Sequence, residues 1–151
     1  MKNAGIRCKG TVEAVDLKTG ETVFRKSNMF VQLGLNEIAK LVAGEAGSIP
    51  AFIAVGTSST TPTGADVVLR GTELGRKSFD EIEITDSSIK YSATFLSGEA
   101  SGIWEETGLF SDTNVLWSRA ITGTYTKKDK DEIRIFWTYE FKDNSEAEAV
   151  S

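Results

Sequence analysis

The sequence predicts a mainly β protein: an antiparallel β-sandwich or barrel-like domain of about eight strands with one amphipathic helix. Apolar and polar residues alternate in several short runs, most clearly over residues 132–141 and 89–95. Turn-forming residues separate these runs at short intervals. Only one stretch has a helical period, whereas a parallel sheet would need several crossover helices. A chain of 151 residues has the size of one domain, so we expect a single domain over residues 1–151.

A β-hairpin is expected near the N-terminus, after a loose arm at residues 1–7. Residues 8–17 alternate in part between apolar and polar side chains and form the expected first strand. Residues 22–26, after a turn, form the second. The turn contains Gly20, which takes a positive φ without steric cost.

The only helical pattern covers about residues 34–43. Val31, Leu35, Ile38 and Val42 are spaced by four, three and four residues, so they would lie on one buried face. Leu41 would widen this face. Gly44 is suited to end the helix in a left-handed cap.

The segment after the helix predicts a buried strand and then an exposed loop. Residues 51–55 contain no polar side chain, which is typical of a strand covered on both faces. Residues 56–66 are rich in Thr, Ser, Pro and Gly and are expected to form a solvent-exposed loop.

The second half of the chain predicts only strands. Residues 77–85 and 89–95 form a second expected hairpin, with a bulge where Phe79 to Ile82 break the alternation. Residues 103–110 fit either a strand and turn or a strand with a bulge, with Gly108 as the irregular residue. Strands at 115–122 and 132–141 flank a polar connection, and the acidic tail at 143–151 is expected to fray.

Composition excludes several kinds of chemistry and partner. The chain has no histidine and one cysteine, Cys8, so a Ser-His-Asp triad, a His-ligated metal site and an internal disulfide are ruled out. We therefore expect no catalytic residues, no metal and no cofactor.

A net charge of −5 argues against a nucleic-acid partner and against docking on anionic lipid. We also expect no membrane insertion, because no apolar run approaches roughly 18 residues, and no signal peptide, because residues 1–13 lack an apolar core.

Two features suggest a recognition surface. Trp104 could stack on a sugar ring, although a place in the core is the alternative. The exposed loop could carry recognition residues, since loops on a rigid scaffold often do, or it could be a plain connection; its candidate residues are Thr57, Ser58, Ser59, Thr60 and Thr61. Glu105 and Glu106 could suggest the two carboxylates of a glycosidase. Adjacent residues of a strand point to opposite faces, so these two cannot form such a pair by themselves.

Four stretches in fixed order resemble a family of small tailed-bacteriophage structural proteins, described as tail-fibre-like or virion accessory (decoration) proteins. They are the turn Thr19-Gly20-Glu21, GLNEIAKLVAG at 34–44, FIAVGTSSTTPTGADVVL at 52–69, and EETGLF at 105–110. The most specific of these features is the IAVGT segment together with its Thr/Pro loop, in the third stretch. Together the four stretches span most of residues 10–140.

The resemblance implies a β-sandwich-like virion component with no known catalytic role. Such a protein would be made in the host bacterial cytoplasm and would dock on the capsid, tail or baseplate through contacts with other virion proteins and with further copies of itself. The alternative is a receptor- or carbohydrate-binding module of a tail appendage. The resemblance assigns no functional residues.

Overall fold

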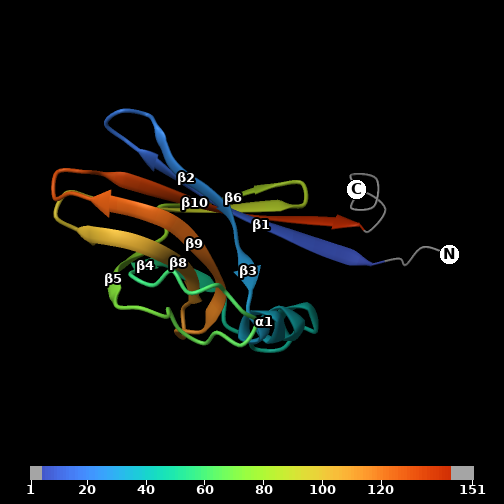
Figure 1. Ribbon diagram of the computed structural model, residues 1–151. Coiled ribbons are helices and arrows are strands. Elements are labelled where there is room, and N and C mark those ends of the chain that lie inside the picture. The colour runs from blue at the N-terminus through green and yellow to red at the C-terminus, as the bar shows by residue number, and fades with distance from the viewer. Residues whose placement is uncertain (1–4, 144–151) are drawn as a thin grey trace.

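The computed structural model describes residues 5–143, which form two five-stranded antiparallel sheets and one helix. The sheets stack as two layers, and the helix lies at one end of them (Figure 1). The predicted β-sandwich with a single helix is therefore confirmed. Within the described residues there are ten strands rather than about eight. No helix in this part of the chain is long and apolar enough to cross a membrane.

The first sheet has the order β2-β1-β10-β7-β6 and contains both predicted hairpins. Its strands are β1 Ile6–Asp16, β2 Thr22–Ser27, β6 Glu81–Thr85, β7 Ser88–Phe95 and β10 Ile133–Asp143. The expected loose arm is wrong for Ile6 and Arg7, because they pair with Asp143 and Lys142 of β10. Asp143 likewise still belongs to β10 and not to a fraying tail. The rest of the two predicted terminal segments, 1–4 and 144–151, lies outside the described residues.

The second sheet has the order β3-β9-β8-β4-β5. Its strands are β3 Met29–Phe30, β4 Pro50–Gly56, β5 Glu73–Ser78, β8 Gly102–Ser111 and β9 Leu116–Lys127. The ambiguous segment at 103–110 is a strand whose register shifts fall between Trp104 and Glu106 and between Leu109 and Phe110. β9 continues to Lys127, so the polar connection before β10 is shorter than expected.

The chain changes sheets where a bulge was expected. β5 ends at Ser78 in one sheet, and β6 begins at Glu81 in the other. Phe79 lies between them and packs against Tyr91, with 4.7 Å between ring centroids. The break in alternation therefore marks a crossover between layers and not an extra residue within one strand, so the predicted bulge is wrong.

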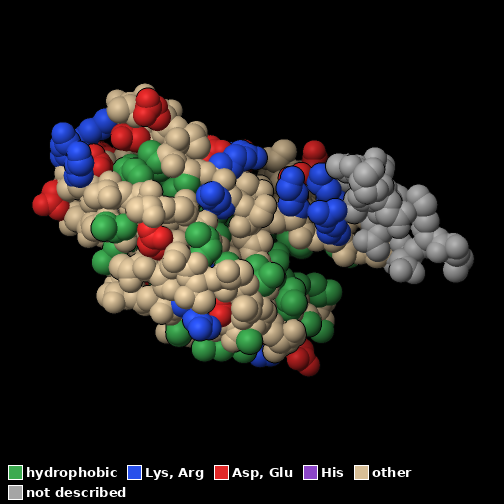
Figure 2. Space-filling model, in the orientation of Figure 1, with side chains coloured by type: hydrophobic (Ala, Val, Ile, Leu, Met, Phe, Trp, Pro, Cys, Tyr) green, Lys and Arg blue, Asp and Glu red, His purple; other side chains and the backbone are tan. Residues whose placement is uncertain are grey.

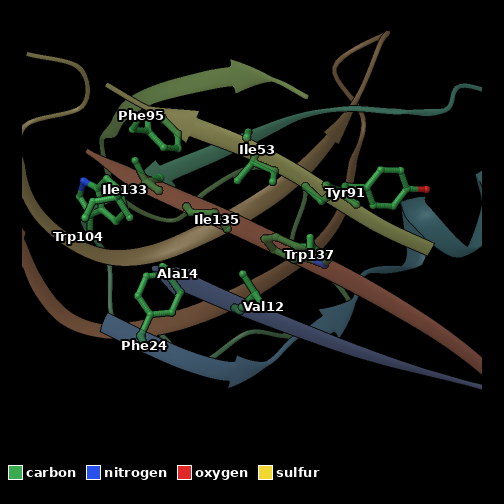
Figure 3. Close-up of a cluster of buried hydrophobic side chains, with 14 of the residues drawn as sticks. Val12, Ala14, Phe24, Ile53, Tyr91, Phe95, Trp104, Ile133, Ile135 and Trp137 are labelled. Carbon is green, nitrogen blue, oxygen red and sulfur yellow. The ribbon is translucent and has the colours of Figure 1, made fainter. Parts of the chain in front are cut away.

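The core lies between the two sheets and is built by the inward-facing positions of each strand. Figure 3 shows Ile133, Ile135 and Trp137 of β10 beside Val12 and Ala14 of β1, all of them buried. Each large apolar side chain removed from water in this way contributes about 1.5–3 kcal/mol before entropy costs. The strict alternation of β10 thus positions the whole first sheet against the second.

The helix α1 spans Gln32–Val42, close to the predicted 34–43, but the predicted inner face is only partly right: Ile38 does pack against the core. Val31 is buried as the N-cap residue, whereas Leu35 and Val42 are exposed. The most buried residues of the helix itself are Gly34 and Glu37.

The close approach of the helix to β9 explains this orientation. A Cβ at Gly34 would lie 2.7 Å from the Cα of Trp117, a contact that real side chains do not make. Only glycine lets the two backbones meet there. The helix therefore packs through a position without a side chain, and its apolar residues Ile38, Leu41 and Val42 lie to one side.

Candidate functional site

The loop at residues 57–72 follows the buried strand β4 and carries the five predicted recognition residues. Thr57, Ser59, Thr60 and Thr61 are exposed and Ser58 is partly buried. Their hydroxyl groups lie together in sequence on a solvent-facing loop, as expected. What holds this loop in place is a set of buried charges beneath it.

Glu106 of β8 is the centre of that set. Its side chain is fully buried, and its carboxylate accepts backbone hydrogen bonds from Ser58 N at 2.8 Å, Arg70 N at 2.7 Å and Gly71 N at 2.7 Å. One carboxylate thus joins both ends of the loop to the sheet.

Arg119 of β9 is also fully buried and binds the same carboxylate, with Nε 2.9 Å from Glu106 Oε1. Its Nη1 donates to the carbonyl oxygen of Thr60 at 2.7 Å, and its Nη2 donates to that of Ser58 at 3.3 Å. The guanidinium group therefore fixes the first residues of the loop, while Glu106 binds the backbone at both of its ends.

Asp66, within the loop, completes the set. Its carboxylate lies 3.3 Å from Arg119 Nη1 and accepts a hydrogen bond from Thr63 N at 3.1 Å. Burial has the largest single influence and opposes ionisation, but the Thr63 hydrogen bond, the charge of Arg119 and the Arg70 contact together lower the pKa of Asp66. We refer to Glu106, Arg119 and Asp66 as the anchor cluster.

The anchor cluster was not predicted from the sequence. Glu106 was considered only as half of a carboxylate pair, and Arg119 only as part of a strand. The signal that could have found it is an acid and a base that each stand two residues after a tryptophan, in two strand segments predicted to follow one another. Every oxygen and nitrogen described here is used to hold the loop, which is a structural arrangement and not an acid–base pair open to substrate.

Trp104 does not belong to any recognition surface. Its side chain is fully buried, its ring contacts Phe95 and Tyr125 at centroid distances of 5.4 and 5.5 Å, and its Nε1 donates to the carbonyl oxygen of Ala100 at 2.8 Å. Figure 3 shows it among the core residues. The predicted role of Trp104 in recognition is therefore wrong, because the side chain is out of contact with water and its Nε1 already has a hydrogen-bond partner.

An open apolar groove of about 340 Å³ lies between α1 and the β6–β7 hairpin. Its lining is almost entirely hydrophobic and comes from both sheets and the helix: Ile38, Leu41, Val42, Ile49, Pro50, Ile82, Ile84, Ile89, Tyr91, Trp117, Tyr139 and Phe141. Sequence reasoning missed this groove, because it expected the helix residues among them to be buried.

The groove has a floor of packed aromatic rings and an exposed rim. In the floor, Tyr139 meets Tyr91 edge-on at 6.0 Å between ring centroids, and Tyr139 is backed by Phe30, which stacks on it at 4.6 Å. On the rim, Val42 is 84% exposed and Ile84 is 73% exposed. Figure 2 shows hydrophobic side chains gathered over α1 at this side of the molecule. Apolar residues concentrated in this way mark a contact surface more often than an accident of sequence.

Glu37 holds α1 in the position that shapes the groove. Its carboxylate accepts hydrogen bonds from Ser48 Oγ at 2.6 Å and Ser48 N at 3.1 Å, and it lies 3.0 Å from Lys40 Nζ. The Ser48 hydroxyl contributes most, followed by Lys40, and together they lower the pKa of Glu37 to about 2. The ionised carboxylate therefore ties the helix to the segment that leads into β4.

Among residues 5–143, no group of three His, Cys, Asp or Glu side chains is placed to hold a metal ion. Comparisons with protein-family models, with curated proteins and with solved structures find no match to this chain. The function of the loop and the groove must therefore be inferred from their residues and from the motif resemblance.

Proposed function

We propose that the protein is a non-enzymatic structural component of a tailed-phage virion, a small accessory protein that docks on the capsid, tail or baseplate surface through protein–protein contacts. The observation that carries this proposal is the apolar groove between α1 and β6. The ordered motif resemblance supplies the virion setting, and the groove supplies the surface for the contacts.

The chemistry of the groove supports protein binding over catalysis. Its lining is hydrophobic and aromatic, and the charged residues of the anchor cluster are not part of it. A preformed apolar surface whose floor consists of buried, packed rings loses little entropy when a partner covers it. The exposed isoleucines of β6 and the exposed end of α1 are the residues that such a partner would remove from water.

The first test is the presence of the protein on phage particles. Particles of the phage that encodes this chain are purified and labelled with gold-conjugated antibody against the protein, then imaged in negative stain. We expect label at a fixed place on each particle. Particles that carry no label would contradict the proposed function.

The second test assigns the contact to the groove. Ile84→Glu places a charge on the exposed rim, and Ile103→Glu is the matched control, because Ile103 is 54% exposed on β8 and does not line the groove. We expect Ile84→Glu to abolish incorporation into particles and Ile103→Glu to leave it unchanged. Equal incorporation of both variants would show that the groove is not the contact surface.

A second candidate function, a receptor- or carbohydrate-binding module, is favoured by the anchored loop. Ser59 and Thr61 are exposed hydroxyl residues on a loop whose backbone is fixed from beneath. A preorganised polar loop can hydrogen-bond a sugar at low entropic cost. A glycan array compares the native protein with a Ser59→Ala/Thr61→Ala variant. Signal above background that the variant loses would favour this function over simple docking.

A further inference from the structure

The outer edge of β6 has no strand beside it among residues 5–143. Along this edge Ile82 and Ile84 line the groove, and Glu81 and Glu83 point to the other face. Glu81 lies 3.7 Å from Arg134, and Glu83 lies opposite Lys90 but forms no salt bridge in the described part of the chain. An exposed edge of this kind is a template for pairing with another strand.

The first residues of β1 form a second unpaired edge at the opposite side of the same sheet. β2 pairs with β1 only from Thr11 onward, so residues 6–9 have no neighbour on that side within residues 5–143. Arg7 and Lys9 lie on one face, opposite Lys142 and Glu140 of β10, and neither forms a salt bridge in this part of the structure. Figure 2 shows basic side chains gathered where the β1–β10 ribbon extends from the body.

The strand register shows which side chains of β6 and β1 lie on the same face of the sheet. Ile82 lies opposite Tyr91, Tyr91 opposite Trp137, and Trp137 opposite Val12, so Ile82 and Val12 share the core-facing side of the sheet. Because side chains alternate along a strand, Ile6 and Cys8 share that side as well. Both free edges therefore carry apolar residues on the core side of the sheet and charged residues on its outer side. The outer charges are positive along β1 and negative along β6.

The order of strands also fixes the direction of pairing. Three successive antiparallel pairings, β1 with β10, β10 with β7 and β7 with β6, make β6 antiparallel to β1. If a second copy continues the sheet with its core side facing the same way, its β1 meets β6 of the first copy in the antiparallel sense.

We infer that the partner at the β6 rim of the groove is a second copy of this chain, which adds the first residues of its β1 to the free edge of β6. One register places each basic residue opposite an acidic one and keeps the apolar residues together: Arg7 with Glu83, Lys9 with Glu81, Cys8 with Ile82, and Ile6 with Ile84. Ile6, which is 83% exposed in the single chain, then packs at the rim of the groove. Opposite charges and apolar pairs placed directly across an antiparallel pair both stabilise it.

Symmetric alternatives are disfavoured by the same charges. Pairing β6 with β6 of another copy would bring Glu81 and Glu83 against their equivalents, and pairing the two β1 edges would do the same with Arg7 and Lys9. Like charges directly opposite each other destabilise a sheet. The contact is therefore head-to-tail, and each copy keeps one edge for the next, which gives a ring or a filament. This inference rests on the proposed role of the groove in protein–protein contact.

Disulfide trapping tests the inferred register, since Cys8 is the only cysteine of the chain. Ile82→Cys places a thiol directly opposite Cys8 of the neighbouring copy, within the Cα separation of about 4.4–6.8 Å that a disulfide needs. Burial raises the pKa of the Cys8 thiol to about 11, so oxidation with copper phenanthroline is carried out at alkaline pH. We expect a ladder of linked copies on non-reducing gels, because every chain offers both thiols.

Two controls accompany the trapping. The native protein, with Cys8 alone, reports any symmetric linkage, and Ile103→Cys provides an exposed thiol on β8, away from both edges. We expect the Ile82→Cys variant to exceed both in linked product. Products that stop at the dimer, or a yield equal to that of Ile103→Cys, would overturn the inference.

A charge exchange tests the same contact without cysteines. Arg7→Glu and Glu83→Lys should each weaken self-association roughly tenfold in sedimentation velocity, and the double variant should restore it. Because Glu83→Lys also faces Lys90 within its own hairpin, thermal unfolding of each variant confirms that the fold is retained. Failure of the double variant to associate more strongly than both single variants would overturn the inference, as would a native protein that remains monomeric at every concentration.

The result is separable from the proposed function. If copies do not pair but gold label is found on particles and Ile84→Glu removes it, only the partner assigned here is wrong. If copies pair in the inferred register but particles carry no label, the virion role fails and the head-to-tail contact stands.

Discussion

The loop at 57–72 and the groove beside α1 distribute polar and apolar residues in opposite ways. The loop presents hydroxyl groups to water and has charges buried beneath it, with Arg119 and Glu106 fully buried. The groove presents isoleucines to water, while Glu37, the charge that positions the helix, is buried behind it. In both regions, the residues that fix the structure differ from the residues that face outward.

This difference separates stability from binding. Buried, fully hydrogen-bonded charges contribute to the fold because removing one leaves its partners unpaired. Exposed apolar residues on a rim contribute little to the fold, so a change there acts mainly on contacts with other molecules. We therefore expect the largest changes in stability at the anchor cluster and the smallest at the rim of the groove.

The largest effect is expected for Arg119→Met. The substitution keeps much of the side-chain volume but leaves the carboxylate of Glu106 buried without a guanidinium partner. Asp66 loses Arg119 and keeps only the half-exposed Arg70. Breaking one partner of a buried ion pair costs about 3–5 kcal/mol, so the free energy of unfolding should fall by that amount. Urea denaturation monitored by tryptophan fluorescence measures it.

Arg25→Met is the matched control, because Arg25 forms an exposed ion pair with Glu13 at 2.6 Å. An exposed pair contributes at most about 1 kcal/mol. Similar losses for the two variants would mean that burial of the anchor cluster does not determine its contribution.

The next largest effect is expected for Gly34→Ala, at the contact between α1 and β9. The added methyl group would overlap the backbone of Trp117, so the helix must move away from the sheet. Overpacking of this kind costs about 1–3 kcal/mol, measured as the change in the free energy of unfolding. The displacement should also alter the groove, because Ile38 and Leu41 line it from the helix.

Gly64→Ala is the control for this substitution, since an added Cβ there meets no atom within 4 Å. We expect no loss of stability, or a small gain from reduced freedom of the unfolded chain. A Gly34→Ala variant as stable as Gly64→Ala would show that the close approach of the helix is not required.

The sequence predicts the strands well because their alternation is a local signal. Residues 132–141 and 89–95 become β10 and β7, and the hairpin near the N-terminus forms as expected. The change of sheet after Ser78 was missed because a bulge and a crossover both break alternation, and only the position of the next strand distinguishes them. Which strands pair depends on the tertiary structure, and the sequence of a single strand does not specify its partner.

The two sites were predictable to different degrees. Exposure of Thr57 and Thr61 follows from the composition of the loop, but its fixation by Glu106 depends on a residue of β8 far along the chain. The groove was missed because helical periodicity assigned Leu41 and Val42, which line it, to the buried face of the helix. A backbone contact at Gly34 turned the helix instead, and a periodicity analysis gives no weight to a residue without a side chain.

Low pH should weaken the attachment of α1 to the segment before β4, because Glu37 makes this attachment. The pKa of this carboxyl in the folded protein is about 2, below its ordinary value of 4.5, so the folded state binds this proton less readily than the unfolded state does. The resulting stabilisation is complete above about pH 4.5 and is lost as the pH falls toward 2. Urea denaturation at a series of pH values measures this dependence, and Glu37→Gln should make it shallower. If the variant loses stability between these pH values as steeply as the native protein, Glu37 is not the source.

The smallest effect on stability is expected for Val42→Ser at the exposed end of α1. Val42 is already in contact with water on most of its surface, so removing its apolar character should change the free energy of unfolding by no more than about 0.5 kcal/mol. The same substitution should reduce binding of any partner that covers the groove, which Val42 lines. Urea denaturation and sedimentation velocity on one preparation measure both quantities. A variant that loses stability while its association is unchanged would reverse the comparison, because it would show that the rim of the groove belongs to the fold and not to a contact surface.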